Sequence, residues 1–398
     1  MSNEAVERAK EHFGKLVEEQ LARVERMKQA EDWIDYSKLD TIKIGLASGD
    51  GIGPYICNET QTVVEHLLAE EVKNGKVKFV DIKGLTIENR YKHMKTIPDD
   101  VLATIKDCHV ILKGPTETPK KGDPRGELES ANVTMRRELD LFANVRPIKI
   151  PEKGINWTFF RENTEGEYVL GSRGIEVTPD LAVDFKVVTS QGAGRIIHAA
   201  LEYARKNGHK RITVVTKSNV VKTTDGKFSA IAHKMGQDYP EVEMDEWYID
   251  IMAAKLIDPA RRAGFQVFVL PNLYGDIITD EAAQIQGGVG TAGSANIGHR
   301  YAMFEAIHGS GVRMVEEGRA KYADPSSMMR AAILMMEHLG FAKRARILAM
   351  AMDICHLYEM KVLCTGKKDG GTSEEFGRYV METCKDPEIE KRWQAFRK

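Results

Sequence analysis

Short apolar runs alternate with helix-like segments from residue 41 onward, and this alternation limits the possible folds more than any other feature. The runs at 42–47, 77–82 and 109–113 are predicted strands, and helices are predicted at 57–71 and 98–106. Strands separated by helices in this way form a largely parallel sheet. The sequence therefore predicts an α/β protein, and at 398 residues it is long enough for two domains.

A second stretch combines a predicted strand with a pair of acids. Residues 265–270 (FQVFVL) are short and apolar, as a buried parallel strand requires, and NLYGDIITD follows at 272–280. We expect Gly275 to form the turn and a helix to run from 276 to 286. Asp276 and Asp280 then share one helix face, which suits a divalent cation such as Mg²⁺ or Mn²⁺. The alternative is that Asp276 caps the helix and Asp280 is solvated, and this stretch alone does not decide between them.

The middle of the chain continues the α/β pattern. Helices are predicted at 131–142, 194–206 and 225–235, and strands at 157–161, 185–189 and 211–216. The glycine-rich residues between the strands at 157–161 and 185–189 could form a β-arm.

A charged amphipathic helix is predicted at residues 3–34, before the first strand. Apolar residues lie along one stripe, and Glu, Lys and Arg fill the other faces. Two interpretations remain open: the helix packs on its own domain, or it is an arm that grips a second subunit.

Composition excludes several classes of protein. The net charge is −2 with both signs interspersed, which argues against a nucleic-acid partner. No apolar run reaches the roughly 18 residues of a membrane span. The five cysteines form no CxxC pair and are expected to be reduced thiols, so a cytoplasmic protein is predicted. The glycines at 49–53 lack the spacing and the acid of a dinucleotide-binding fingerprint.

Three arginines lie close together in the sequence beside apolar segments. Arg136, Arg146 and Arg161 would be costly to bury without anions. A guanidinium group binds a carboxylate through two oxygens, so a small polycarboxylate is the expected ligand. Surface salt bridges explain any one of these arginines equally well, but explain the three together less well.

Six segments in order resemble one family. SxNVxxRxELDL, ANVRP, RENTEGEY, TKSNV, NLYGDIITD and GSANIG resemble the metal-dependent β-decarboxylating dehydrogenases of isocitrate and isopropylmalate over about residues 41–380. The resemblance implies their two-domain fold, with a large cofactor-binding domain, a small domain and an N-terminal helical extension added here. The expected bounds are 41–143 with 287–398 for the large domain, 144–286 for the small domain with a dimer arm at about 166–190, and 1–40 for the extension.

The resemblance also implies catalytic roles within a homodimer that shares its active sites. Asp276 and Asp280, with Asp250 of the neighbouring subunit, would hold Mg²⁺ or Mn²⁺. Lys217, also from the neighbouring subunit, would relay a proton, and Tyr168 would protonate the enol carbon.

Ser130 and Asn132 favour isocitrate as the substrate, because they match the residues that hold its third carboxylate in the family. Together with Arg136, Arg146 and Arg161 they form the implied substrate site. The implied reaction is oxidative decarboxylation of isocitrate to 2-oxoglutarate and CO₂. Alternatives within the class are an NAD-dependent isocitrate, a homoisocitrate or a 3-isopropylmalate dehydrogenase, and the alternative of another class is a non-catalytic regulatory subunit.

NADP is the cofactor that the resemblance favours, with NAD as the alternative. Arg313 stands where NAD-dependent members resembling isopropylmalate dehydrogenase carry an aspartate, and a basic residue suits a 2′-phosphate. The loop departs from the family pattern in lacking Ala-Pro and in having Asp324 in place of asparagine. The residues expected at the cofactor are Lys113, Thr118, Asn219, His308, Gly309, Ser310, Arg313, Met314 and Asp324.

Overall fold

The computed structural model describes residues 2–29, 33–119, 122–171, 173–288 and 292–397. It divides into two compact units. Unit 1 comprises residues 1–33 and 140–282, and unit 2 comprises residues 34–139 and 283–398. Residues 30–32, which we predicted to belong to the N-terminal helix, lie outside the described residues.

Unit 2 contains five neighbouring strands in the order β2-β1-β3-β12-β11. The strands are β1 (Ile42–Ala47), β2 (Val77–Asp81), β3 (Val110–Lys113), β11 (Gly293–Ile297) and β12 (Ala302–Ala306). Its pairs are parallel except for the antiparallel pair of β11 and β12. The accompanying helices are α2 (Gly53–Leu67), α3 (Ala69–Lys73), α4 (Ile87–His93), α5 (Asp99–Asp107), α6 (Ala131–Glu138), α11 (Val312–Glu316), α12 (Ser326–His338), α13 (Ala342–Met352), α14 (Ser373–Cys384) and α15 (Ile389–Ala395).

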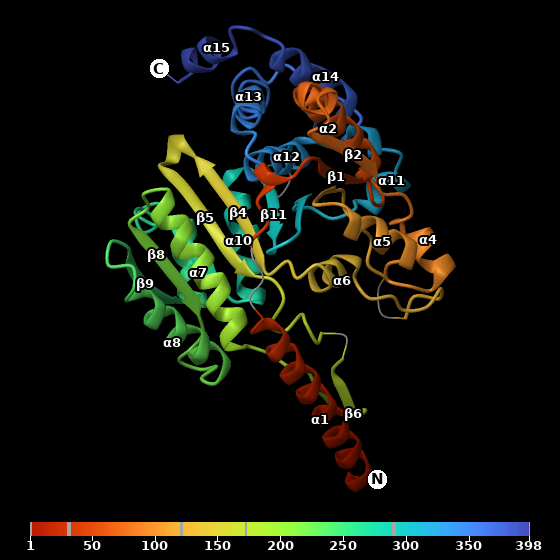
Figure 1. Ribbon diagram of the computed structural model, residues 1–398, viewed down its shortest axis with the longest axis vertical. Coiled ribbons are helices and arrows are strands. Elements are labelled where there is room, and N and C mark those ends of the chain that lie inside the picture. Colours follow the sequence, from red (N-terminus) through yellow and green to blue (C-terminus); the bar gives the residue numbers. More distant parts are fainter. Residues whose placement is uncertain (1, 30–32, 120–121, 172, 289–291, 398) are drawn as a thin grey trace. The chain divides into compact units, whose positions relative to one another are not determined.

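Unit 1 contains five further neighbouring strands in the order β4-β5-β10-β8-β9. Its strands are β4 (Ala143–Ile150), β5 (Ile155–Glu162), β8 (Arg211–Thr216), β9 (Glu243–Tyr248) and β10 (Val267–Leu270). The helices are α1 (Ser2–Met27), α7 (Ser190–Lys206), α8 (Thr224–Gly236), α9 (Ile249–Ile257) and the greater part of α10 (Asn272–Gln286). A separate antiparallel hairpin joins β6 (Ile175–Thr178) and β7 (Leu181–Val183), and α1 lies beside β6 (Figure 1).

Four strands of unit 1 run in the same direction. The segments that follow them therefore begin at the same edge of the sheet. β5, β10, β8 and β9 are parallel, whereas β4 is antiparallel to β5. Carboxyl ends of parallel strands form the usual binding edge of an α/β sheet. The segments after these strands carry Tyr168, Asp276, Lys217 and Asp250.

The predicted fold class is confirmed, including the largely parallel sheet, the β-arm and the N-terminal helix. No helix among the described residues is both long enough and apolar enough to span a membrane. All five cysteines are free thiols.

Several predicted elements were wrong in detail. The helix predicted at 131–142 ends at Glu138, because Asp140 adopts a left-handed backbone with φ of 45°. The segment 185–189 is no strand, since it makes only a single bridge from Val187 to Gly166. β9 was missed because its sequence, EMDEWY, is acidic; Asp245 on this strand is paired with Arg211 on β8 at 2.6 Å.

The prediction that Gly275 forms a turn was also wrong, because α10 begins at Asn272 and includes it. A Cβ atom at Gly275 would lie 2.4 Å from Cγ of Arg161. The glycine therefore leaves room for the Arg161 side chain to cross the first turn of the helix. Because Asp276 lies inside α10, it does not cap the helix, so this part of the alternative was wrong.

Candidate active site

Two arginines of unit 1 project from one face of the sheet and are almost completely buried. In the antiparallel pair of β4 and β5, Arg161 lies opposite Asn144, two residues from Arg146. Residues two apart on a strand share a face, so both guanidinium groups point the same way. The side chains of Arg146 and Arg161 are 7% and 1% exposed. Burial of two such charges requires anions close by.

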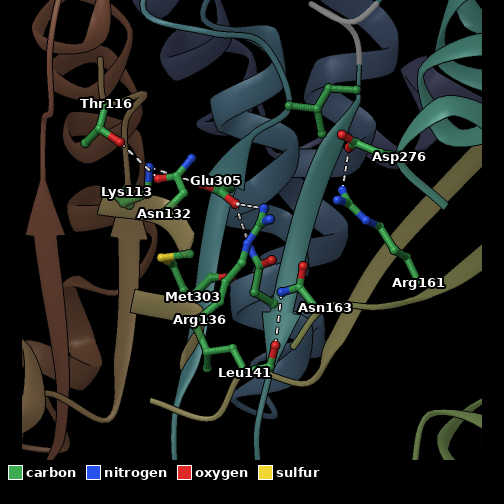
Figure 2. Close-up of polar contacts among 12 residues, drawn as sticks. Lys113, Thr116, Asn132, Arg136, Leu141, Arg161, Asn163, Asp276, Met303 and Glu305 are labelled. Carbon is green, nitrogen blue, oxygen red and sulfur yellow. Dashed lines mark hydrogen bonds and ion pairs between the residues drawn. The ribbon is translucent and has the colours of Figure 1, made fainter. Parts of the chain in front are cut away.

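The anions are the two carboxylates predicted from the sequence. Arg146 donates to Asp280 at 3.0 Å and lies 3.6 Å from Asp276. Arg161 forms a close ion pair with Asp276, which Figure 2 shows. Asp276 and Asp280 lie one turn apart on α10, as predicted. Burial raises the pKa of the Asp280 carboxyl above its ordinary value, and the positive charge of Arg146 opposes that change.

Tyr168 belongs to the same cluster. Its hydroxyl donates to Oδ2 of Asp276 at 3.0 Å, and the Arg161 guanidinium lies 5.5 Å from the ring centre. Burial raises the pKa of the Tyr168 hydroxyl, and the negative charge of Asp276 raises it further. The phenol is therefore held in its protonated form, as a proton donor requires.

Asn272 connects these groups to the loop after β5. Its Oδ1 accepts from Nε and Nη2 of Arg161 at 3.1 and 2.7 Å, and its Nδ2 donates to the backbone carbonyl of Glu165 at 2.9 Å. Thr279 adds a hydroxyl that accepts from Arg146 at 2.6 Å. These two residues fix both guanidinium groups in place.

Lys217 and Asp250 form a second cluster of unit 1. Nζ of Lys217 lies 2.5 Å from Oδ1 of Asp250. The hydrogen bond from Lys217 lowers the pKa of the Asp250 carboxyl. The buried Asp225 accepts from the backbone N–H of Lys217 at 2.8 Å and fixes the start of this loop.

Unit 2 contains a buried ion cluster around Glu305. β3 and β12 place Lys113 directly opposite Glu305, and Nζ of the lysine lies 3.0 Å from the carboxylate. Arg136 on α6 lies 3.3 Å from the other carboxylate oxygen of Glu305 (Figure 2). Asn296 donates to the same oxygen at 2.8 Å. Burial alone would raise the pKa of the Glu305 carboxyl, but Lys113 and Arg136 outweigh it and lower the pKa to about 2.

The remaining predicted substrate residues lie at the start of α6. Ser130 occupies the position before the helix, where its side chain makes no capping bond. Asn132 accepts from the Thr116 hydroxyl at 2.9 Å (Figure 2). The buried Arg90 donates to the backbone carbonyls of Thr96, Glu117 and Glu129, and these bonds shape the loop before α6.

The residues predicted to bind the cofactor do not all lie in one unit. His308, Gly309, Ser310, Arg313, Met314 and Asp324 belong to unit 2, as do Lys113 and Thr118, whereas Asn219 belongs to unit 1. Arg313 lies on α11 with its side chain 85% exposed, 2.7 Å from Glu317. Burial lowers the pKa of His308, whose Nδ1 lies 3.0 Å from the carbonyl of Gly309. Asp324 accepts from the backbone N–H of Ser326 at 2.9 Å.

The candidate donors for a metal are chemically suitable, but the described residues bring together fewer than three of them. Asp276 and Asp280 offer the carboxylate oxygens that Mg²⁺ and Mn²⁺ prefer. Among the described residues, no group of three or more His, Cys, Asp or Glu side chains is placed to hold a metal. The residues therefore fit two ligands of a site that needs further donors from outside this set.

Four functional candidates were missed from the sequence. Glu305 could have been found, because it is a lone acid inside the apolar run AMFEA. Asn272, Thr279 and Glu165 lie inside recognised motifs, but no pattern in the sequence separates them from their neighbours.

Fold and site together define a class: an α/β protein in which two buried arginines pair with two partly exposed carboxylates, on a helix that follows a parallel strand. A model of the isocitrate/isopropylmalate dehydrogenase family matches residues 43–361. The chain belongs to this family, as the resemblance predicted.

Relatives with either cofactor are about equally similar. The NADP isocitrate dehydrogenase of Rickettsia prowazekii is 37% identical over 308 residues, which cover 75% of this chain and 59% of that protein. Subunit 2 of the mitochondrial NAD isocitrate dehydrogenase of Schizosaccharomyces pombe is 34% identical over 313 residues, which cover 76% of this chain and 77% of that protein. The alignment thus spans about three fifths of the Rickettsia enzyme.

A solved structure supports the fold. The crystal structure of isocitrate dehydrogenase from Methylococcus capsulatus matches with a TM-score of 0.76 and 31% identity, covering 87% of this chain and all of that one. The N-terminal helix α1 lies outside the residues that the family model matches.

Proposed function

We propose that the chain is an isocitrate dehydrogenase that converts isocitrate to 2-oxoglutarate and CO₂ and reduces NADP. The observation that carries this proposal is the convergence of two buried guanidinium groups, Arg146 and Arg161, on one pair of carboxylates. Guanidinium groups held in this way are preorganised for the carboxylates of a small polyacid. Ser130, Asn132 and Arg136 are assigned to the substrate by their motif alone.

Asp276 and Asp280 would serve two purposes. Without ligand they neutralise Arg146 and Arg161. A substrate carboxylate that binds these arginines would release the aspartates toward a divalent cation. We assign the cation to Asp276, Asp280 and Asp250 of a second subunit, and when bound it supplies Lewis-acid stabilisation of negative charge on the substrate oxygen.

Two residues would move protons. Lys217 would relay the proton that leaves the substrate hydroxyl, working across the interface of a homodimer. NADP, when bound, would supply the hydride acceptor for the carbon that carries the hydroxyl, which becomes a ketone. On the adjacent carbon, the bond to the carboxylate would then break, CO₂ would leave, and the electron pair of that bond would form an enolate. Tyr168 would donate its phenolic proton to this adjacent carbon.

NADP is preferred over NAD because of Arg313. Its exposed guanidinium could receive a 2′-phosphate, in exchange for its present contact with Glu317. Lys367 and Lys368 lie on a later loop and add positive charge. NAD-dependent isocitrate oxidation is the alternative, since relatives of both kinds are similarly close.

A matrix of substrates and cofactors tests the proposal. Reduced-cofactor absorbance is followed with isocitrate, homoisocitrate and isopropylmalate, each with NADP or NAD, and each with or without Mg²⁺. We expect the highest kcat/KM for isocitrate with NADP and Mg²⁺. Faster turnover of isopropylmalate would refute the substrate, and equal kcat/KM for NAD would refute the cofactor preference. No turnover of any pair would favour a non-catalytic subunit.

A further inference from the structure

Arg23 connects the N-terminal helix to the loop that carries Tyr168. It lies on α1, and its Nη1 donates to Oε1 of Glu165 at 2.9 Å, while Nη2 donates to the hydroxyl of Thr164 at 3.3 Å. The side chains of Arg23 and Glu165 are 16% and 2% exposed. Such a pair is sheltered from solvent, so removal of the arginine would leave a buried carboxylate without its cation, which is costly.

The loop beneath Arg23 holds two buried carboxylates. Glu162 accepts from the backbone N–H groups of Thr164 and Glu165 at 2.9 and 2.6 Å. Glu165 accepts from the backbone N–H of Thr189 at 2.8 Å, at the start of α7. Burial, and then the charge of Glu165, raise the pKa of Glu162 to about 7. Two acids so close together repel each other when both are ionised, and a cation beside them lowers that cost.

A second guanidinium group at Thr164 is already paired with another acid. Arg195 donates to the Thr164 hydroxyl at 2.9 Å, but it also binds both oxygens of Asp140. Arg23 is therefore the guanidinium that directly neutralises Glu165. Glu165 is also packed tightly against Gly192 of α7. A Cβ atom at Gly192 would lie 2.2 Å from the carboxyl carbon of Glu165, so no larger residue fits at position 192.

Glu165 is connected to the candidate active site by a short series of hydrogen bonds. Its backbone carbonyl accepts from Asn272, whose side-chain oxygen accepts from Arg161. Three residues after Glu165, the Tyr168 hydroxyl donates to Asp276. Movement of the loop 162–168 would therefore shift both the proposed proton donor and an arginine of the proposed substrate site.

We propose that Arg23 is a positioning residue: α1 supplies the cation that holds loop 162–168 and thereby orients Tyr168 and Arg161. This inference rests on the proposed function for its effect on turnover. The helix is anchored at two further points, since Glu19 pairs with Arg173 and the ring of Phe13 lies 5.5 Å from that of Phe185. Because α1 lies outside the family match, this support is a feature of the extension in this chain.

The test compares R23M with R26M, which removes the same charge from an exposed position one turn further along α1. Misplacement of reacting groups by about 1 Å can lower turnover on the order of 100-fold. We expect kcat of folded R23M to fall by about 10- to 100-fold, with R26M within about twofold of the unmodified protein. R23K should lie between the two, since it keeps the charge but not the second hydrogen bond.

Hydrogen exchange supplies a readout that does not depend on the reaction. The amides of Thr164 and Glu165, which donate to Glu162, should exchange faster in R23M and R23K than in R26M. A purely stabilising helix would lower the melting temperature of R23M but leave its kcat and these amides unchanged, and that result would overturn the inference. If R23M does not fold, R23K against R26K decides by the same two criteria. If the unmodified protein does not oxidise isocitrate, the proposed function fails, and amide exchange alone decides whether Arg23 holds the loop.

Discussion

Neutralising Glu305 should destabilise unit 2 strongly. The substitution E305Q keeps the shape of the side chain and removes its charge. It leaves the ammonium of Lys113, which is fully buried, beside a neutral amide and the carbonyl of Gly114 at 2.7 Å. Arg136 also loses its carboxylate partner. An uncompensated buried charge is the costly part of such a change.

Two independent estimates of the stability lost in E305Q agree in magnitude. Removal of one partner from a buried ion pair costs about 3–5 kcal/mol. Lowering the pKa of Glu305 from 4.5 to about 2 corresponds to about 3 kcal/mol of stability. Because the folded pKa is depressed, this stability is present above about pH 4.5 and is lost only as the pH falls toward 2. At pH 7 we therefore expect E305Q to lose about 3 kcal/mol of unfolding free energy.

Urea denaturation at pH 7, followed by intrinsic fluorescence, checks this value. The matched control is E138Q, because Glu138 pairs with Lys106 at the surface and should lose less than about 1 kcal/mol. The double variant K113M/E305Q should lose less than the sum of the single variants, since it also removes the ammonium that E305Q leaves unpaired. A loss below about 1 kcal/mol for E305Q, or additive losses in the double variant, would refute the reasoning.

Three further predictions concern the cofactor, the dimer and pH. R313D should raise KM for NADP about tenfold or more and leave KM for NAD within about twofold; steady-state kinetics with both cofactors measure this, and equal changes would exclude Arg313 from the 2′-phosphate site. Inactive K217M and Y168F chains, refolded together, should regain part of the activity if Lys217 acts across the dimer, and no recovery in verified mixed dimers counts against that arrangement. Burial lowers the pKa of His338 to about 4, and its neutral ring lies 3.0 Å from the Tyr36 hydroxyl, so stability should fall by up to about 3 kcal/mol from pH 6.5 to 4. Melting curves of H338Q should show a weaker pH dependence, and identical curves would refute this assignment.

The sequence predicted the fold class well because strand and helix periodicity is local. The apolar runs that became β1, β3, β8 and β10 each carry the pattern of a buried parallel strand. β9 was not predicted because its stability comes from partners on β8, and these contacts leave no pattern in the local sequence. Gly275 was misinterpreted for the same reason: its small size serves Arg161, which lies more than a hundred residues earlier in the chain.

Site residues could be predicted where they belong to a sequence motif. They could not be predicted where their role depends on contacts made in the folded protein. The spacing of Asp276 and Asp280 placed both on one helix face, and the structure shows them there. Their pairing with Arg146 and Arg161 requires the antiparallel register of β4 and β5, and the sequence prediction had not recognised β4 as a strand. Arg23 is one of many charged residues on α1, and only the fold distinguishes it from Arg26.

Charge balance in unit 1 suggests why substrate and metal would bind together. Arg146 and Arg161 carry two positive charges, and Asp276 and Asp280 carry two negative charges, so the cluster is neutral as it stands. If a polycarboxylate alone binds Arg146 and Arg161, the two aspartates lose their positively charged partners. If a dication alone binds Asp276 and Asp280, the two arginines lose their negatively charged partners. Either ligand by itself would thus create unpaired charge in a partly buried site, which is costly. When both are bound, the substrate carboxylates pair with the arginines and the dication pairs with the aspartates, so we expect each ligand to raise the affinity for the other. In the substrate-by-cofactor matrix, isocitrate turnover that is independent of Mg²⁺ would contradict this coupling.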